Sequence, residues 1–364
     1  MFAWLTSLFS GKSQRANASG SASLVHAVSS GASTRTPRAS VRRASPPSPP
    51  ATPARSADEP YIDTLAREVG ALTALTPFQE QSTSLLVEAV SSYVGTHAID
   101  PPVMPALASR MLELLRADEV DVVALSRLIE KDQATAAKLM SIANSALYKG
   151  NTEVQGVRDA VVFLGTEQVA QIAIGLASRA MFEAPVDRRN AVGAERFQRL
   201  FNHAMTTAFA ACHLATQRSR RHSEAAFLGG LFHDVGKAVA LRAIHDMVRA
   251  KQIEQPSEVV VDAALQQIHG EPTAALYQSW KLPRQLMSMC QNHHRLALDT
   301  VPELHFVRLA SGLDALRTGA DVDKREALQE IGESAAALKL NDAQVRVANT
   351  ETHAFGERVL HMFG

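Results

Sequence analysis

The sequence predicts an all-α protein that follows a long N-terminal segment without a core of its own. From Pro60 to the last residue, apolar side chains recur every three to four positions, which is the period of helices buried along one face. No stretch keeps the two-residue alternation of a half-buried strand, and only Val259–Val261 briefly suggests one. Apolar residues make up 46% of the 364 residues, which is enough to bury a substantial core.

The N-terminal segment, residues 1–58, differs sharply from the rest in composition. Ser, Ala, Pro, Gly and Arg dominate it, and its first 57 residues hold seven Lys or Arg and no Asp or Glu. Such a composition offers too little apolar surface to offset the entropy of ordering the chain, so we expect a disordered basic tether. Only Met1–Phe9 is apolar, and this short peptide is expected to make weak contact with a membrane surface or a partner.

The periodicity of residues 59–182 predicts a helical extension followed by a first bundle. The extension, residues 59–97, contains a helix at 78–94 whose apolar positions include Phe78, Leu85, Leu86 and Val90. Pro101 and Pro102 then stop the helical pattern. The bundle is predicted to hold helices at 103–116, 121–130, 134–147 and 166–182, with Asp121 and Thr166 at N-cap positions.

The remaining sequence predicts a second group of helices. They are expected at 195–217, 224–240, 257–268, 272–279, 283–295 and 302–317, with residues 296–364 as the C-terminal helices of this group.

Charge, hydropathy and cysteine content exclude several classes of protein. After residue 57 the chain holds 30 basic and 37 acidic residues, a net charge of about −7, so the folded part is not expected to bind DNA. No apolar run reaches the roughly 18 residues of a membrane span, and Met1–Phe9 lacks the flanks of a secretory signal. Cys212 and Cys290 lie in apolar helical contexts without a CxxC motif, as expected of buried thiols in the cytoplasm.

Histidines and one aspartate form the candidate site. His233 and Asp234 end the apolar stretch AAFLGGLF, and burying both is costly unless a partner such as a divalent cation binds them. Further histidines fall on other predicted helices, which is how a helical bundle builds an internal metal site. They are His203, His269, His293 and His294.

This pattern resembles the HD superfamily of metal-dependent phosphohydrolases. The resemblance implies that His203, His233 and Asp234 are core ligands of Fe, Mn or Zn, and that His269 with His293 or His294 completes a second metal position. Metals in such a site activate water and neutralise the charge that develops on phosphate.

The last ligand departs from the family pattern. Where the family has an Ala-Asp step on its closing helix, this chain has Ala310-Ser311, and a neutral hydroxyl is a poor ligand for these metals. Asp314 is one turn further on, about 4.5 Å along the axis, and is the alternative ligand. The residues therefore form either an incomplete metal centre or a polar network that fixes helix register without metal. Lys237 would either contact a phosphate or end its helix in solvent.

Residues 98–295 resemble more narrowly the HDOD domains of bacterial signalling. The motifs are Pro102–Pro105, Asp132, Ala143-Asn144-Ser145, Ala160–Gly165, FHDVGK and Asn292-His293-His294, with Gln133 where the family usually has Pro. The resemblance implies a two-lobed helical fold in which residues 296–364 complete the HD-like lobe. Asp132, Asn144, Ser145 and Gly165 are then structural motif residues, and we expect Asn144 and Ser145 to hydrogen-bond a helix turn to its neighbour.

HDOD domains act in bacterial regulation and usually lack demonstrated hydrolase activity. The resemblance therefore implies a non-catalytic signalling module that binds a protein partner or a nucleotide. The alternative is a metal-dependent phosphohydrolase acting on a nucleotide or cyclic dinucleotide. The Gly-Tyr-Pro signature of HD-type cyclic di-GMP phosphodiesterases is missing, because Arg295-Leu296-Ala297 follows the histidine pair.

Overall fold

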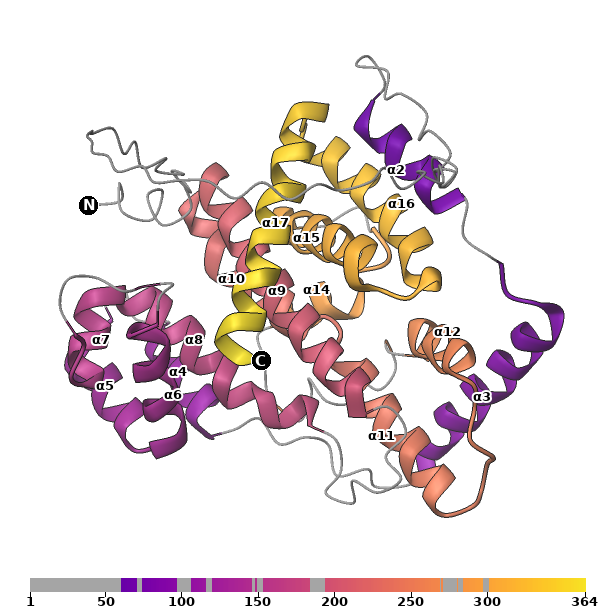
Figure 1. Cartoon of the computed structure of the whole chain (residues 1–364), viewed down its shortest axis with the longest axis horizontal. Helices are drawn as coiled ribbons and strands as arrows, with labels where there is room; N and C mark the ends of the chain where they lie inside the picture. Colours follow the sequence, from indigo (N-terminus) through magenta and orange to yellow (C-terminus); the bar gives the residue numbers. More distant parts are fainter. Residues whose placement is uncertain are drawn as a thin grey trace, which may run out of the picture. The chain divides into compact units, whose positions relative to one another are not determined.

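The structure, a computed structural model, describes residues 60–70, 74–96, 106–115, 120–145, 148, 153–183, 194–268, 270, 280, 284–296 and 301–364. These residues form α-helices and short 3-10 turns, with no strand among them (Figure 1), so the predicted all-α class is confirmed. The expected tether with Met1–Phe9, the predicted helix at 272–279 and His269 lie outside the described residues. A search of the described helices finds none that is both long and apolar enough to cross a membrane.

Five helices and a 3-10 turn form the first lobe. They are α4 (Ala106–Leu115), α5 (Val122–Glu130), α6 (Gln133–Ala143), α7 (Val157–Leu164), α8 (Thr166–Ser178) and η1 (Arg179–Phe182). The helices pack against one another around fully buried Leu125, Ile129, Leu139 and Ile172. The predicted helix at 134–147 ends earlier, at Ala143, and the predicted helix at 166–182 finishes in η1. The eight-residue α7 is too short for the periodicity to have shown it.

Side-chain caps begin two helices of this lobe, and the one at Asp121 was predicted. Asp121 accepts a hydrogen bond from Val123 N at 2.8 Å, and Asp132 accepts one from Thr135 N at 2.9 Å. The N-cap prediction for Thr166 is wrong by one residue, because α8 is preceded by Gly165. Gly165 has φ 89° and ψ 152°, a backbone conformation that only glycine adopts without strain, and it joins α7 directly to α8.

Asn144 explains why α6 ends where it does. Its side-chain amide donates to Val154 O and its Oδ1 accepts from Val154 N, each at 2.9 Å. The pair of hydrogen bonds ties the end of α6 to the segment that leads into α7, as expected for Asn144. Ser145 differs, because its Oγ has no hydrogen-bond partner among the described residues.

The second lobe is built around α9 (Ala194–Arg218), which packs against α10, α15 and α17. The other helices are α10 (Ser223–Phe232), α11 (Val235–Arg249), α12 (Glu258–Ile268), α14 (Arg284–Gln291), α15 (Pro302–Thr318), α16 (Asp321–Ala337) and α17 (Asp342–Phe363). A Cβ at Gly230 would lie 2.7 Å from the backbone of Ala208, so glycine is required for α10 to approach α9 this closely.

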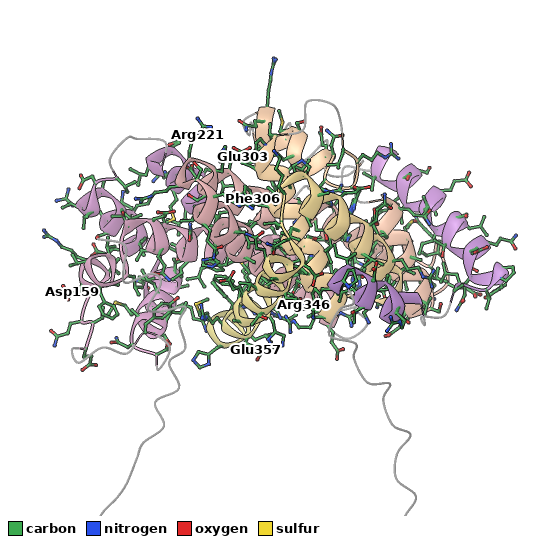
Figure 2. All side chains as sticks on the ribbon, turned by 90° about the horizontal axis from the view of Figure 1, so that it is seen from above. Asp159, Arg221, Glu303, Phe306, Arg346 and Glu357 are labelled. Atoms are coloured by element: carbon green, nitrogen blue, oxygen red, sulfur yellow. The ribbon has the colours of Figure 1, made fainter. Side chains whose placement is uncertain are left out.

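Two helices that precede the first lobe in sequence pack on the second. The first, α2 (Tyr61–Gly70), contacts α16 and α17, and Arg346 of α17, labelled in Figure 2, lies 4.5 Å from the centroid of the Tyr61 ring. The second, α3 (Pro77–Thr96), contacts α12 and α11. Of the residues that predicted α3, Leu86 and Val90 are buried, whereas Phe78 and Leu85 are 77% and 60% exposed. The helix was predicted correctly, but its buried face is narrower than the sequence suggested.

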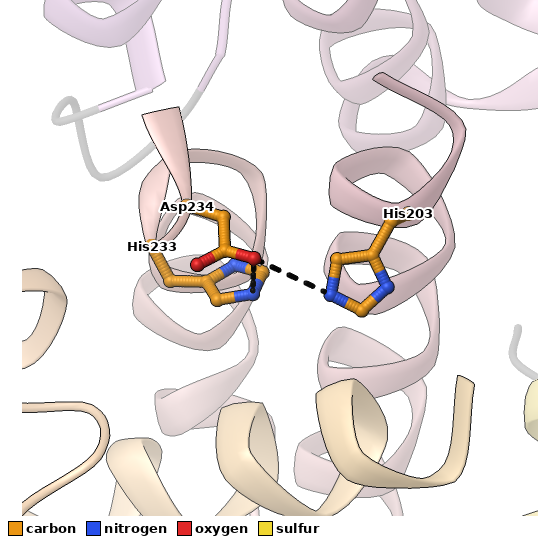
Figure 3. A group of neighbouring side chains, drawn as sticks. All are labelled: His203, His233 and Asp234. Atoms are coloured by element: carbon orange, nitrogen blue, oxygen red, sulfur yellow. Dashed lines mark ion pairs between the residues drawn. The ribbon is translucent and has the colours of Figure 1, made fainter. Parts of the chain in front are cut away.

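The predicted single helix at 224–240 is two helices, and the break falls at His233 and Asp234. Asp234 leaves the helical conformation, with φ −106° and ψ 10°, and α11 starts at Val235. Consecutive side chains on an unbroken helix point about 100° apart. The break instead turns both side chains toward α9 (Figure 3), where the site forms.

Candidate metal site at the His-Asp pair

His203, His233 and Asp234 meet between α9 and the junction of α10 with α11 (Figure 3). Asp234 Oδ2 lies 3.5 Å from His233 Nε2 and 3.8 Å from His203 Nε2. Ligands about 2.1 Å from a tetrahedral metal would lie about 3.4 Å from one another. The three residues expected to be core ligands are therefore brought together at nearly the spacing of a divalent metal site.

The outer ring nitrogens of two buried histidines are fixed by backbone carbonyls. His233 Nδ1 lies 2.8 Å from Gly230 O, and His293 Nδ1 lies 2.7 Å from Cys290 O. Their Nε2 atoms consequently face inward, and His293 Nε2 is 3.3 Å from Asp234 Oδ1. Metalloproteins orient histidine ligands in the same way, through hydrogen bonds at the nitrogen that does not bind metal.

Asp314 holds His203 from the side away from the site. Its Oδ2 lies 2.7 Å from His203 Nδ1, and its Oδ1 accepts a hydrogen bond from Arg317 Nη2 at 2.9 Å. Burial alone would raise the pKa of Asp314, but its contacts with His203 and Arg317 lower it below its ordinary value. The sequence offered Asp314 as an alternative ligand, and in the structure its carboxylate contacts the outer ring nitrogen of His203.

Ser311 occupies the space where the family pattern has a carboxylate. Its Oγ lies 3.3 Å from both His203 Nε2 and His233 Nε2. The hydroxyl therefore faces the same space as the inward nitrogens, but it brings no charge to it. Asp234 remains the only carboxylate among these four residues.

Lys237 lies in the first turn of α11 and neutralises that carboxylate. Its Nζ is 2.9 Å from Asp234 Oδ2, and the residue is buried, so it does not end a helix in solvent. Burial would lower the pKa of Lys237, but Asp234, Asp323 and Glu326 together outweigh it, and the pKa is raised above its ordinary value. The same carboxylate oxygen that would bind a metal thus already binds an ammonium group.

These residues form a central ion-pair chain that alternates in sign. It runs Arg317, Asp314, His203, Asp234, Lys237. Burial would lower the pKa of His203, yet the hydrogen bond and charge of Asp314, together with the charge of Asp234, raise it above its ordinary value, which favours the protonated ring. These ion pairs connect α9, α11 and α15 to one another.

The two buried histidines beside this chain are neutral. Burial lowers the pKa of His233 well below its ordinary value, even though Asp234 is adjacent. Burial, together with the charge of His294, also lowers the pKa of His293. Both rings therefore present unprotonated nitrogens at neutral pH.

His294 pairs with two carboxylates that sequence analysis missed. Its Nδ1 lies 2.8 Å from Glu330 Oε1 and 2.9 Å from Glu326 Oε1, both on α16. Burial would lower the pKa of His294, but the two glutamates raise it to about 9. The sequence could have pointed to these glutamates only by their position. Each directly precedes a buried apolar residue of α16, Glu326 before Ala327 and Glu330 before Ile331.

A cavity of about 270 Å³ lies against the site. It is lined by His203, Asp234, Lys237, His294 and Ser311, together with Arg196, Arg199, Asp262, Asp323, Glu326 and Glu330. Arg196 is paired with Asp262 at 2.7 Å. Acidic and basic side chains are thus mixed in this wall, which does not favour ligands of one charge sign.

Comparison with known proteins identifies a sequence family and a fold. The HDOD domain family matches residues 102–296. An HDOD domain protein with unknown function from Geobacter sulfurreducens is 18% identical, with a TM-score of 0.55 over 77% of this chain and 99% of that one. A Shewanella amazonensis SB2B protein, provisionally described as a metal-dependent phosphohydrolase, is also 18% identical, with a TM-score of 0.52 over 76% of this chain and 99% of that one.

Two further relatives widen this comparison. A Marinobacter aquaeolei VT8 protein, provisionally described as a signal transduction protein, is 20% identical, with a TM-score of 0.54 over 81% of this chain and 67% of that one. An uncharacterized Treponema pallidum (strain Nichols) protein is 27% identical over 202 residues, which are 53% of this chain and 38% of that relative's length. At these identities the solved structures establish the shared fold.

Proposed function

Because this chain belongs to the HDOD domain family, we propose that it is a non-catalytic module of bacterial signal transduction that works by binding a regulatory partner. One observation carries the proposal: Asp234, the carboxylate of the His-Asp pair, binds the ammonium of Lys237 and faces the neutral Ser311 side of the site. The carboxylate that would bind a catalytic dication is instead neutralised by an ammonium group of the protein itself.

The charge balance of the His-Asp site explains why turnover is not expected. Hydrolysis of a phosphate ester in this fold would require a metal to activate water and to neutralise developing charge. Lys237 already binds Asp234, and Asp314 raises the pKa of His203 above its ordinary value, so a dication would compete with an ammonium group for the one carboxylate of this set. Its binding would require Lys237 to leave Asp234.

The charges on the cavity wall make a nucleotide the weaker candidate ligand. A cyclic dinucleotide would bring phosphates against Asp234, Glu326 and Glu330 as well as against Lys237. Because the cations on this wall are largely paired, phosphate binding would have to break existing ion pairs. We therefore propose a signalling protein as the partner, in the cytoplasm, with the nucleotide as the weaker candidate.

A second function, metal-dependent phosphohydrolysis, is favoured by the ligand spacing. His203, His233 and Asp234 would hold Fe, Mn or Zn, whose chemistry would be to activate a water molecule. In that case Asp314 and Gly230 would keep the two imidazoles oriented, and Lys237 would be free to contact a phosphate oxygen once displaced from Asp234.

A hydrolysis assay separates the two functions. Wild-type protein and Asp234→Ala are incubated with cyclic di-GMP, nucleoside triphosphates and a generic phosphodiester, each with Mn²⁺, Fe²⁺ or Mg²⁺. The proposal predicts background rates for both proteins with every substrate. Wild-type turnover that Asp234→Ala abolishes would refute the non-catalytic module and establish the phosphohydrolase.

A further inference from the structure

An apolar groove lies between α9, α15 and α17 in the second lobe. It has a volume of about 270 Å³ and shares no lining residue with the cavity at the His-Asp pair. Its apolar walls come from Leu214, Phe306, Leu309, Leu338, Leu340 and Val347. All of these except Leu214 follow residue 296, where the family match ends. This α9–α17 groove is therefore distinct from the candidate metal site.

The turn between α16 and α17 forms a fixed wall of the α9–α17 groove. Lys339 N donates to Ala336 O at 3.0 Å and Leu340 N donates to Ala335 O at 2.9 Å, which is the hydrogen-bond pair of a Schellman motif. Lys339 has φ 52°, a left-handed conformation that favours glycine. Leu338 and Leu340, on either side of Lys339, both line the groove. This wall is thus formed before a partner binds, which lowers the entropic cost of binding.

The apolar surface of the α9–α17 groove is partly open to solvent. Phe306 and Leu309 are buried at its floor, whereas Leu338 and Leu340 are half-buried and Val347 is 54% exposed. Apolar surface that is concentrated in a groove, with polar side chains around it, is typical of protein interfaces. A groove between helices suits an amphipathic helix whose apolar side chains recur every three to four positions.

Unpaired cations lie at the rim of the α9–α17 groove. Arg218 lines it and donates to Leu338 O at 3.0 Å, and Lys339 lies in the turn that forms its wall. Both cations are exposed, and neither has a carboxylate partner among the described residues. Glu351, the acidic side chain among the lining residues, already contacts His213 Nε2 at 3.3 Å. The rim therefore carries an excess of positive charge.

A third exposed cation, Arg221, lies near the Phe306 part of the groove. It belongs to η3 (Arg220–His222), and Nδ1 of the adjacent His222 lies 2.5 Å from Glu303 Oε1. Glu303 precedes Phe306 by about one turn of α15, and Figure 2 shows both close to Arg221. Arg221 also has no carboxylate partner within the described part of the chain. The positive charge thus extends from the α16–α17 turn to η3.

We propose that the α9–α17 groove binds an amphipathic helix of a partner protein, with its apolar face in the groove and acidic residues on its flanks. This helix belongs to the regulatory partner of the proposed function, on which the assignment rests. Acidic flanks would meet Arg218, Arg221 and Lys339, and such complementarity speeds association and selects the partner. The chain's own N-terminal segment does not complement the rim, because residues 1–57 hold seven Lys or Arg and no acidic residue.

Peptide selection tests both the surface and the chemistry of the partner. Random peptides of about 16 residues, enough for about four helical turns, are displayed on phage and selected on the immobilised full chain. Each recovered peptide is tested again on Val347→Glu, which puts a charge into the groove at an exposed helix position that tolerates it. We expect peptides with apolar residues every three to four positions and a net negative charge. Their binding to Val347→Glu should be at least about tenfold weaker.

Two lysines with the same backbone conformation provide a matched pair of variants for the rim charge. Lys339→Gly removes a rim cation at φ 52°, and Lys251→Gly makes the same change at φ 57° after α11, away from the groove. Glycine suits both conformations, so both variants should fold, and circular dichroism checks this. By fluorescence anisotropy at low salt, Lys339→Gly should weaken binding of the selected peptides by about two- to fivefold, and Lys251→Gly by less than about twofold.

Several results would overturn the assignment of the α9–α17 groove. They are selected peptides that are basic or uncharged, peptides that bind Val347→Glu as well as wild type, equal effects of the two lysine variants, and a selection that enriches no peptide. Sedimentation of the full chain tests a different occupant, because self-association that Val347→Glu abolishes would assign the groove to a second copy instead. The hydrolysis assay does not involve this groove, so failure of the proposed function would be seen separately.

Discussion

Replacing Ser311 with Asp should rebuild an anionic ligand at the His-Asp pair. Ser311 Oγ is already 3.3 Å from both inward-facing nitrogens of His203 and His233, and Asp adds a carboxylate at nearly the same place. The site would then offer two carboxylates and two imidazoles to a metal. A set of this kind is sufficient for tetrahedral coordination of Zn²⁺ or for partial coordination of Mn²⁺.

The magnitude follows from the charges nearby. Without metal, two carboxylates about 4 Å apart repel by about 4 kcal/mol at an effective dielectric constant of 20, and the ammonium of Lys237 on Asp234 offsets part of this. We expect Ser311→Asp in EDTA to be less stable than wild type by about 1 to 3 kcal/mol. Metal at a hundredfold excess over its Kd returns about 2.7 kcal/mol, which corresponds to a rise in Tm of about 5 to 10 °C.

Thermal unfolding with EDTA and with Mn²⁺ or Zn²⁺ measures both effects. The matched control is Ser311→Asn, which has the shape of Asp without its charge. Metal that binds elsewhere on the protein would raise the Tm of all three proteins alike, so the informative quantity is the additional rise in Ser311→Asp. Equal metal-induced shifts in wild type, Ser311→Asn and Ser311→Asp would refute the placement of Ser311 at the missing ligand position.

Three further predictions test the fold. Asn144→Ala should lower the free energy of unfolding by about 1 to 3 kcal/mol in urea titrations, because Val154 N and O lose their partner; an unchanged midpoint would contradict this. Gly165→Ala should cost about 1 to 3 kcal/mol through backbone strain alone, since no atom lies within 4 Å of the added Cβ, and a neutral effect would argue against φ 89°. Both cysteine thiols are protected by burial. The pKa of Cys212 is raised to about 12, and Cys290 is only 1% exposed. Native protein at pH 8 should therefore react with thiol reagents only as fast as it unfolds, and rapid labelling would show an accessible thiol.

Much of the fold follows from local sequence signals. Three- and four-residue apolar spacing predicted α9 and α15 to within one residue at either end, and Asp121 caps its helix as expected. The break after α10 was not predictable from periodicity, because the apolar pattern continues through it. It arises from tertiary contacts that hold His233 and Asp234 against α9.

The site was predictable in composition but not in its internal pairing. The family motifs identified His203, His233 and Asp234 as candidate ligands, and the structure places these three residues together. The pairing of Asp234 with Lys237 and of Asp314 with His203 depends on side-chain directions across three helices, which sequence spacing does not contain. The contribution of α16 was missed because two glutamates on an amphipathic helix are usually a solvated face.

The most direct test of the proposed non-catalytic site is a crystal structure of the wild-type protein soaked in Mn²⁺, with anomalous data collected at the manganese edge. The account predicts no anomalous peak among His203, His233 and Asp234, with Lys237 Nζ still in contact with Asp234 Oδ2. A manganese peak bound by these three residues, with Lys237 displaced from Asp234, would contradict it.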